Sequence, residues 1–274
     1  MRTLAFLACG LLACSGDTFA TGDAGGSDGE TDDTAVPDAV VPDAGSVDAC
    51  APAPGACNTT DQRCTSFDDG TYTPPFDDLS TNGGTVSVDP TKSFSCPDGL
   101  KASMPPITTG VSPASPAIAA IGGKITLGGS PSYKITLELD VWLPSPSAVP
   151  TSFFAVGPPG DSADAVALTH DATGWHIHLA AEPEGSQDSD VSPPPLTEDW
   201  NHMKLTTNVS SVAATQTTLE YVDASRQTKT ATAVGSTYGA LPPPTSLGAI
   251  VGITVVTATP ATVAFYDDVE LTAD

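Results

Sequence analysis

Two carboxylates and an indole share one face of a segment that alternates between apolar and polar residues. Residues 134–143 read KITLELDVWL, with an apolar side chain at every second position. Alternation with a period of two predicts a half-buried strand. Glu138, Asp140 and Trp142 fall on its polar face, where Trp142 could stack on a sugar ring and the carboxylates could bind hydroxyl groups. The alternative is an ordinary strand with one charged face and a partly buried tryptophan.

The same residues resemble a catalytic strand. Glu138-Leu139-Asp140-Val141 is similar to the start of the Glu-hydrophobic-Asp-hydrophobic-Glu strand of laminarinase-type glycoside hydrolases. In those enzymes two carboxylates act as nucleophile and acid. Glu138 and Asp140 match the nucleophile and its helper, so the resemblance gives them as alternative catalytic residues. The second glutamate is absent, because Trp142 and Leu143 occupy both places where it could stand. Without an acid to protonate the leaving oxygen that mechanism fails, so a non-catalytic role is favoured.

The elements around this strand are further strands. Turn residues recur every eight to a dozen positions, proline clusters fall between the apolar runs, and no helical period appears. This spacing predicts an all-β jelly-roll sandwich of a dozen or so strands. The other predicted strands cover residues 165–170, 175–181, 203–209, 217–223, 228–234, 247–256 and 262–272.

The charge balance excludes some partners. The chain has 33 acidic and 9 basic residues among 274, a net charge of −24. A surface without a cationic excess cannot displace counterions from phosphate, which excludes nucleic acid as a partner. It also disfavours an electrostatic hold on anionic lipid. No segment after the amino terminus is long and apolar enough for a transmembrane helix.

The first 14 residues, MRTLAFLACGLLAC, predict export. One basic residue precedes an apolar run that is too short to span a bilayer, as in a secretion signal. Leu11-Leu12-Ala13-Cys14 resembles the bacterial lipobox, in which the cysteine carries the lipid anchor. The resemblance implies a lipoprotein that is anchored to a membrane through Cys14. The alternatives are the motif ending at Cys9 and an ordinary cleaved signal peptide.

A flexible acidic spacer is predicted after Cys14. In Gram-negative lipoproteins the residue after the lipidated cysteine influences sorting, and Ser15 at this position is compatible with the outer membrane of the cell envelope. Residues 15–49 contain nine acidic residues and no lysine or arginine. A segment this polar cannot bury enough apolar surface to offset its ordering entropy, so we expect a disordered linker. Loose binding of Ca²⁺ by its acidic residues is the alternative. Residues 50–61 then form a short connector that contains disulfide cysteines.

The order of several motifs resembles the concanavalin A-like lectin/glucanase superfamily, and within it the laminin-G-like domains. The likeness covers residues 62–274 and implies a jelly-roll domain. It rests on segments 64–70, 95–103, 200–205, 219–223 and 264–271. With the second glutamate absent, this favours a non-catalytic module that binds a glycan or an envelope protein. The alternatives are a hydrolase of the same fold and a structural envelope protein without a specific ligand.

Four cysteines remain after export, namely Cys50, Cys57, Cys64 and Cys96. An even number in an oxidising compartment predicts two disulfides, for which three pairings are possible. In the resembled fold, Cys64 precedes the first strand and Cys96 begins a partner strand. This favours a bond between Cys64 and Cys96 and another between Cys50 and Cys57. A zinc site is the alternative, although the spacing contains no C-x-x-C pair.

Two pairs of aspartates form a candidate cation site. In the resembled fold the last strand pairs with the first, which would bring Asp68 and Asp69 to Asp267 and Asp268. Like charges in contact repel each other and favour a bound cation. Ca²⁺ accepts irregular sets of oxygen ligands, so these four residues are tentative ligands of a structural calcium ion. The alternative is that one aspartate of each pair caps a turn while the other faces water.

Overall fold

The structure is a computed structural model that describes residues 62–68, 70–72, 76, 78–95, 98–112, 115–127, 132–157, 165–181, 185–210, 215–235 and 246–274. The predicted leader, the lipid attachment at Cys14, the linker 15–49 and the connector 50–61 lie outside these ranges and stay predictions. Within these ranges no helix has the length and apolar character of a membrane span.

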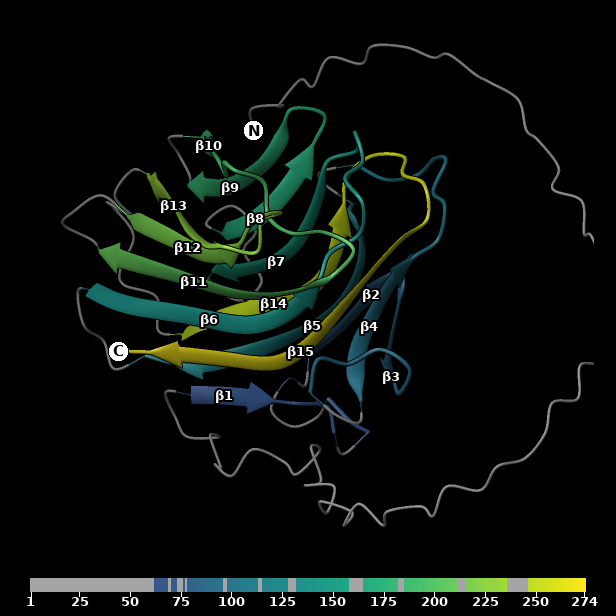
Figure 1. Cartoon of the computed structure of the whole chain (residues 1–274), viewed down its shortest axis with the longest axis horizontal. Coiled ribbons are helices and arrows are strands. Elements are labelled where there is room, and N and C mark those ends of the chain that lie inside the picture. Colours follow the sequence, from purple (N-terminus) through teal and green to yellow (C-terminus); the bar gives the residue numbers. More distant parts are fainter. Residues whose placement is uncertain are drawn as a thin grey trace, which may run out of the picture. The chain divides into compact units, whose positions relative to one another are not determined.

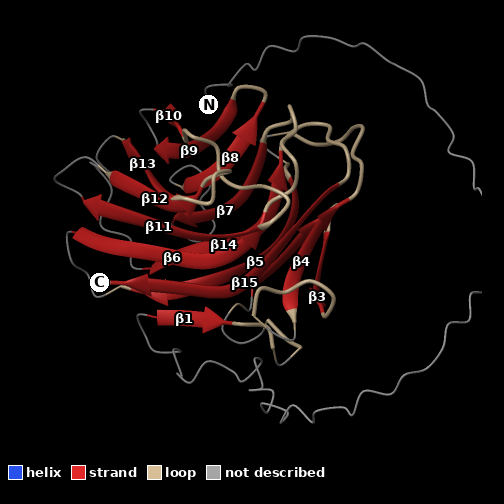
Figure 2. Ribbon diagram, viewed as in Figure 1, coloured by secondary structure: helices blue, strands red, loops and turns tan. Residues whose placement is uncertain are grey.

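The described chain folds as two antiparallel sheets that pack face to face (Figures 1 and 2). This confirms the predicted all-β jelly-roll sandwich. The larger sheet has eight strands in the order β13-β12-β11-β6-β15-β4-β3, with β1 paired to β15. Its strands are β1 (Gln62–Thr65), β3 (Thr85–Asp89), β4 (Gly99–Met104), β6 (Ser132–Trp142), β11 (Trp200–Ser210), β12 (Gln216–Val222), β13 (Thr228–Val234) and β15 (Thr262–Ala273).

The second sheet has seven strands in the order β10-β9-β8-β7-β14-β5-β2. Its strands are β2 (Asp78–Asn82), β5 (Ala117–Thr126), β7 (Thr151–Gly157), β8 (Val166–Asp171), β9 (Gly174–Ala181), β10 (Gly185–Asp190) and β14 (Ser246–Val255). The predicted hairpin at Asp171–Gly174 joins β8 to β9, and Gly174 adopts a φ of +137° there. A residue with a β-carbon rarely adopts this φ, which explains the glycine.

The core lies between the sheets and follows from the alternation along each strand. The odd-numbered residues of β6 from Ile135 to Val141 are at most 1 % exposed, as a strand with one face in the core requires. The residues Leu247, Ala249, Val251, Ile253 and Val255 of β14 are equally buried on the facing sheet. One polar contact also joins the layers, because the hydroxyl of Tyr266 on β15 donates to the carbonyl of Phe153 on β7 at 2.9 Å.

Strand β15 is an interior strand of the larger sheet and pairs with three others. It pairs with β6 along one side, while β4 and β1 divide the other side between them. The predicted pairing of the first and last strands is confirmed by the register from Gln62↔Thr272 to Thr65↔Val269. The predicted strand near Ser95–Ser103 begins only at Gly99 and pairs with β3 and β15, not with β1. The expectation that this strand pairs with β1 is wrong. Strand β15 is long enough to pair with β4 along residues 262–266 and with β1 along residues 269–272.

Candidate functional site

A row of aromatic side chains crosses the outer face of the larger sheet. Trp200 on β11 lies directly opposite Trp142 on β6, which lies opposite Phe265 on β15. Residues that face each other on paired strands point to the same side of a sheet. The rings of Trp142 and Phe265 meet edge to face with 5.7 Å between centroids. We call these three residues the aromatic row; Trp142 and Trp200 are partly exposed.

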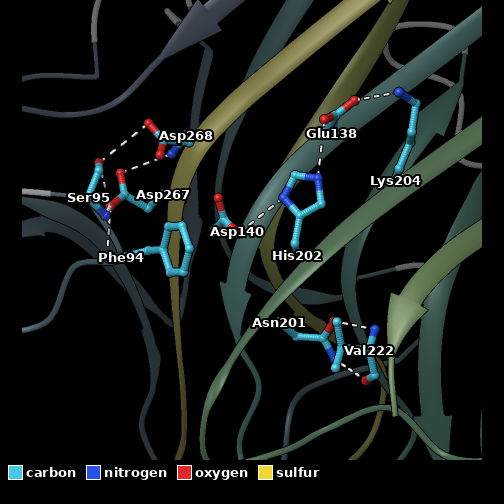
Figure 3. A network of polar contacts seen from close by, with 10 residues as sticks. All are labelled: Phe94, Ser95, Glu138, Asp140, Asn201, His202, Lys204, Val222, Asp267 and Asp268. Atoms are coloured by element: carbon cyan, nitrogen blue, oxygen red, sulfur yellow. Dashed lines mark hydrogen bonds and ion pairs between the residues drawn. The ribbon is translucent and has the colours of Figure 1, made fainter. Parts of the chain in front are cut away.

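Next to the aromatic row, an exposed histidine lies between the two carboxylates that the sequence singled out. His202 on β11 places Nδ1 3.2 Å from Asp140 Oδ1 and Nε2 3.2 Å from Glu138 Oε1. Lys204 Nζ is 2.7 Å from the other oxygen of Glu138. Figure 3 shows His202 between the two acids, with Lys204 beyond Glu138. These four residues form the His202 network, and the imidazole is 54 % exposed.

The two carboxylates of the network differ in their environment. The side chain of Asp140 is 5 % exposed, and burial raises its pKa despite the charge and hydrogen bond of His202. Partial burial acts in the same direction on Glu138, but the hydrogen bond and charge of Lys204 outweigh it and lower the pKa of Glu138. Neighbouring acids whose pKa values are pushed apart are a common feature of sites that transfer protons.

The strand that carries His202 is fixed by its buried neighbour. Asn201 is fully buried and donates from Nδ2 to the carbonyl of Val222 at 2.7 Å. The amide of Val222 donates back to Asn201 Oδ1 at 2.9 Å (Figure 3). This pair joins β11 to the end of β12, beyond their regular pairing, which runs from Lys204↔Glu220 to Asn208↔Gln216. Buried hydrogen bonds of this kind fix the backbone and so set the orientation of the functional side chain next to them, here His202.

A polar pocket continues the site along the same strands. It has a volume of about 220 Å³ and is lined by residues of β6, β11 and β15 together with the last residue of the chain. Two lysines, three acids and two threonines make up its wall: Lys134, Thr136, Glu138, Lys204, Glu270, Thr272 and Asp274. The pocket thus shares Glu138 and Lys204 with the His202 network, and its hydroxyl, ammonium and carboxylate groups suit the hydroxyl groups of a sugar.

Basic residues are concentrated in this sheet. Of the nine in the chain, Arg63, Lys101, Lys134, Lys204 and Lys229 lie in its strands, whereas the strands of the other sheet contain Lys124 alone. Lys101 and Lys204 point to the same face as the aromatic row, since they pair with Phe265 and Glu138 respectively. Lys134 points to this face as well, whereas Arg63 and Lys229 pair with the core residues Leu271 and Tyr221.

The aspartates of the predicted calcium site lie beside the network. Asp267 is fully buried and accepts hydrogen bonds from the amides of Phe94 and Ser95, each at 2.8 Å (Figure 3). Desolvation and the adjacent charge of Asp268 raise the pKa of Asp267 to about 7. Desolvation also raises the pKa of Asp268, with a contribution from the charge of Asp68. Asp68, Asp267 and Asp268 are thus close enough for their charges to interact.

Whether these aspartates bind a cation stays a prediction. Asp69 lies outside the described residues, and among those that are described no group of three or more histidines, cysteines or acids has the arrangement of a metal site. One oxygen of Asp68 is buried without a hydrogen-bond partner in the described structure. Coordination of a cation by this oxygen would explain its position. A bound calcium ion would add positive charge beside Asp267 and would lower its pKa.

The raised pKa of Asp267 predicts a dependence of stability on pH. Between about pH 4 and pH 7 the folded chain holds a proton that the unfolded chain has released, so stability falls as the pH rises through this window. The slope from this residue should reach about 1.4 kcal/mol per pH unit. We expect Asp267→Asn to lose this slope, because asparagine is neutral in both states. Urea unfolding of both proteins at several pH values measures the difference; parallel pH profiles would contradict it.

The described structure tests the cysteine prediction at one residue only. Cys64 is disulfide-bonded, but Cys50, Cys57 and Cys96 lie outside the described residues, so the pairing stays a prediction. Of the other histidines, His170 packs against Trp175 in the interior at 4.7 Å between centroids. His176 and His178 instead contact aspartates of β10, with ring nitrogens 3.1 Å from Asp190 and 2.6 Å from Asp188.

The fold of this chain is similar to that of enzymes of known structure. No family model matches the chain, and no curated protein matches its sequence. The fold is similar to the PL-14 alginate lyase from Aplysia kurodai, with a TM-score of 0.58 and 9% identity over 79% of this chain and 100% of that one. It is also similar to the endo-β-1,4-glucuronan lyase from the fungus Trichoderma reesei, with a TM-score of 0.51 and 12% identity over 77% and 94% of the two chains.

These likenesses correct the functional prediction. The sequence favoured a non-catalytic glycan- or protein-binding module, whereas these two solved structures are lyases that act on polysaccharides. The prediction of a non-catalytic module is wrong because hydrolysis was the single catalytic reaction that it took into account. The missing second glutamate disfavours the hydrolase that this strand resembles, but elimination requires a proton acceptor and a cation instead. His202 and Lys204, which the sequence did not single out for chemistry, are groups of these two kinds.

Proposed function

We propose that this chain is a polysaccharide lyase that cleaves a uronate-containing glycan on the outer face of the eight-stranded sheet. The observation that carries the proposal is the exposed His202, held by the buried Asp140 and located beside Lys204. A base oriented by a buried carboxylate is a recurrent device for removing a proton from a substrate. The fold shared with an alginate lyase and a glucuronan lyase supports the same reaction class.

The proposed reaction is a β-elimination. In a 4-linked uronate the proton on C5 is acidified by the adjacent carboxyl group. His202 Nε2 takes this proton, and the electrons of the C5–H bond form a double bond between C4 and C5. The bond from C4 to the glycosidic oxygen then breaks, and that oxygen receives the proton from His202. The products are an unsaturated uronate and a new sugar end, so protons and electrons balance without any other reactant.

Each member of the His202 network has a place in this reaction. Asp140, 5 % exposed, orients the imidazole through Nδ1 and leaves Nε2 on the side of Glu138 and solvent. Lys204 supplies the positive charge that stabilises the substrate carboxylate as negative charge develops on it. In the free protein that ammonium is held by Glu138 at 2.7 Å, and the hydrogen bond and charge of Glu138 raise its pKa. Lys204 is therefore charged over the whole working range of pH.

The surroundings of the network provide contacts for the neighbouring sugars. On one side the aromatic row offers ring faces for stacking, and on the other side the polar pocket offers hydroxyl and charged groups. Both lie on strands β6, β11 and β15, so a glycan that crosses the network would contact both. A site with contacts on both sides of the reacting bond suits cleavage within a chain.

Ultraviolet absorbance tests the proposal, because a C4=C5 double bond conjugated with a carboxyl group absorbs there. We expect the purified chain to produce this absorbance from β-1,4-glucuronan or alginate. Cellulose oligomers, which lack the carboxyl group, should give neither absorbance nor new sugar ends. New reducing ends from the acidic polymers without ultraviolet absorbance would instead indicate hydrolysis. The absence of any cleavage of uronate polymers would reject the proposal.

A further inference from the structure

One lysine covers the aromatic row. Lys92, in the connection from β3 to β4, places its ammonium 3.1 Å from the centroid of the Trp142 ring and 4.8 Å from that of Phe265. An ammonium over a ring face is attracted by the negative π-cloud of the ring. The face of Trp142 that a sugar would use for stacking is therefore occupied by a cation in this structure.

Lys92 differs from the other lysines at the site. Lys101 is 3.4 Å from Asp89, and Lys204 is 2.7 Å from Glu138, so both have a carboxylate partner. Lys92 forms no ion pair within the described part of the chain, and the acids that influence it, Asp199 and Glu198, act only through their charge. Its partial burial lowers its pKa, which indicates that the ammonium has lost part of its hydration. It is the cation best placed to accept a new anion.

The backbone beside Lys92 is fastened to the sheet while the side chain lies on the rings. Asp89 accepts a hydrogen bond from the amide of Thr91 at 2.8 Å, and Asp267 accepts those of Phe94 and Ser95. Phe94 in turn packs edge to face on Trp200, with 6.0 Å between ring centroids. These contacts hold the backbone on both sides of Lys92, so its four-carbon side chain is the part that can turn away from Trp142.

We propose that Lys92 is a displaceable cap that makes the aromatic row selective for acidic sugars. A neutral sugar that stacks on Trp142 must remove the ammonium from the rings without offering it a partner. A sugar with a carboxylate removes it as well, but provides an anion for the same ammonium. Binding is then selected by charge at a point separate from the His202 network. This inference rests on the proposed function for the identity of the ligand, and assigns to Lys92 a role in specificity.

A pair of oligosaccharides that differ only at C6 tests this role. β-1,4-linked tetraglucuronate and cellotetraose have the same backbone and linkage, so their affinity ratio measures the selection by charge. Binding is followed by tryptophan fluorescence and calorimetry in His202→Gln protein, which prevents cleavage during the titration. We expect Lys92→Ala to weaken binding of the tetraglucuronate and to strengthen binding of cellotetraose, so that the ratio falls about tenfold. Lys92→Arg should preserve it, since arginine also stacks as a cation.

Lys124→Ala is the matched control, since Lys124 is an exposed lysine on the other sheet and should leave the ratio unchanged. An equal change in both affinities on Lys92→Ala would overturn the cap, as would an unchanged ratio or the failure of both oligosaccharides to bind. The outcomes remain separable from those of the lyase proposal. A ratio that falls while the wild-type chain forms no unsaturated product would keep the cap and reject the lyase. Cleavage with an unchanged ratio would do the reverse.

Discussion

Replacing His202 by glutamine is expected to lower kcat on a uronate polymer by about 10² to 10⁴-fold, the range typical for loss of a general base. Glutamine has a similar reach and can still form hydrogen bonds with Asp140 and Glu138, but it cannot take up and return a proton. KM should change much less than kcat, because the aromatic row and the polar pocket remain. Initial rates of ultraviolet absorbance over a range of polymer concentrations separate the two constants.

Two further variants serve as comparisons for His202→Gln. Asp140→Asn should lower kcat by less than His202→Gln, because the imidazole stays while its orientation is weakened. His178→Gln is the control, since His178 pairs with Asp188 on the other sheet and should leave the rate unchanged. If His202→Gln retained half of the wild-type kcat, another residue would be the proton acceptor. A comparable loss in His178→Gln would show that histidine replacement acts through folding.

Gly252→Ala is expected to be the most damaging single-methyl change in the core. Gly252 on β14 lies opposite Ala120 on β5, next to the irregularity between Val251 and Thr254 in the pairing of β14 with β7. A β-carbon there would lie 2.2 Å from the carbonyl oxygen of Ala119 and 2.4 Å from the α-carbon of Ala120. Both are backbone atoms of a neighbouring strand, so the clash can be relieved only by separating β14 from β5.

The φ of +146° at Gly252 adds strain for any residue with a β-carbon. We expect Gly252→Ala to reduce the free energy of unfolding by at least about 4 kcal/mol, or to prevent folding. Gly174→Ala is the matched control, because Gly174 has a similar φ of +137° but open space around its α-carbon. It should cost about 1–3 kcal/mol, the strain alone. Equal losses in urea unfolding would mean that strain, and not the contact, decides the effect at Gly252.

The parts of the fold that the sequence predicted are those in which one face is clearly apolar. Strands β6 and β13 alternate with a period of two, and both were found within two residues of their predicted limits, as was the strand near residues 262–272. Strand β5 reads AIAAIGGKIT, in which small residues on both faces hide the alternation. Strand β10 reads GSQDSD and has no apolar face at all; it forms by pairing with β9 at the edge of the sheet.

For a related reason, the sequence predicted only some of the residues of the candidate site. Glu138, Asp140 and Trp142 share a face of one strand, which alternation alone reveals. Their partners His202 and Lys204 lie on β11, some 60 residues later, and meet them only through the register His202↔Asp140 and Lys204↔Glu138. A slip of one residue would turn both side chains to the other face. Register depends on the whole sheet, so no local pattern could join these four residues.

The position of β15 also determines when this sheet can form during synthesis. The last strand of the chain separates β6 from β4 and holds β1, whose residues 62–65 pair with residues 269–272. Until β15 leaves the ribosome, strands β6, β4 and β1 lack their common neighbour. Folding that depends on such distant pairings is slow and leaves strand edges open to aggregation. The sheet that carries the site can therefore be completed only after residues 262–273 have been synthesised, and a chain without these residues should fail to assemble it.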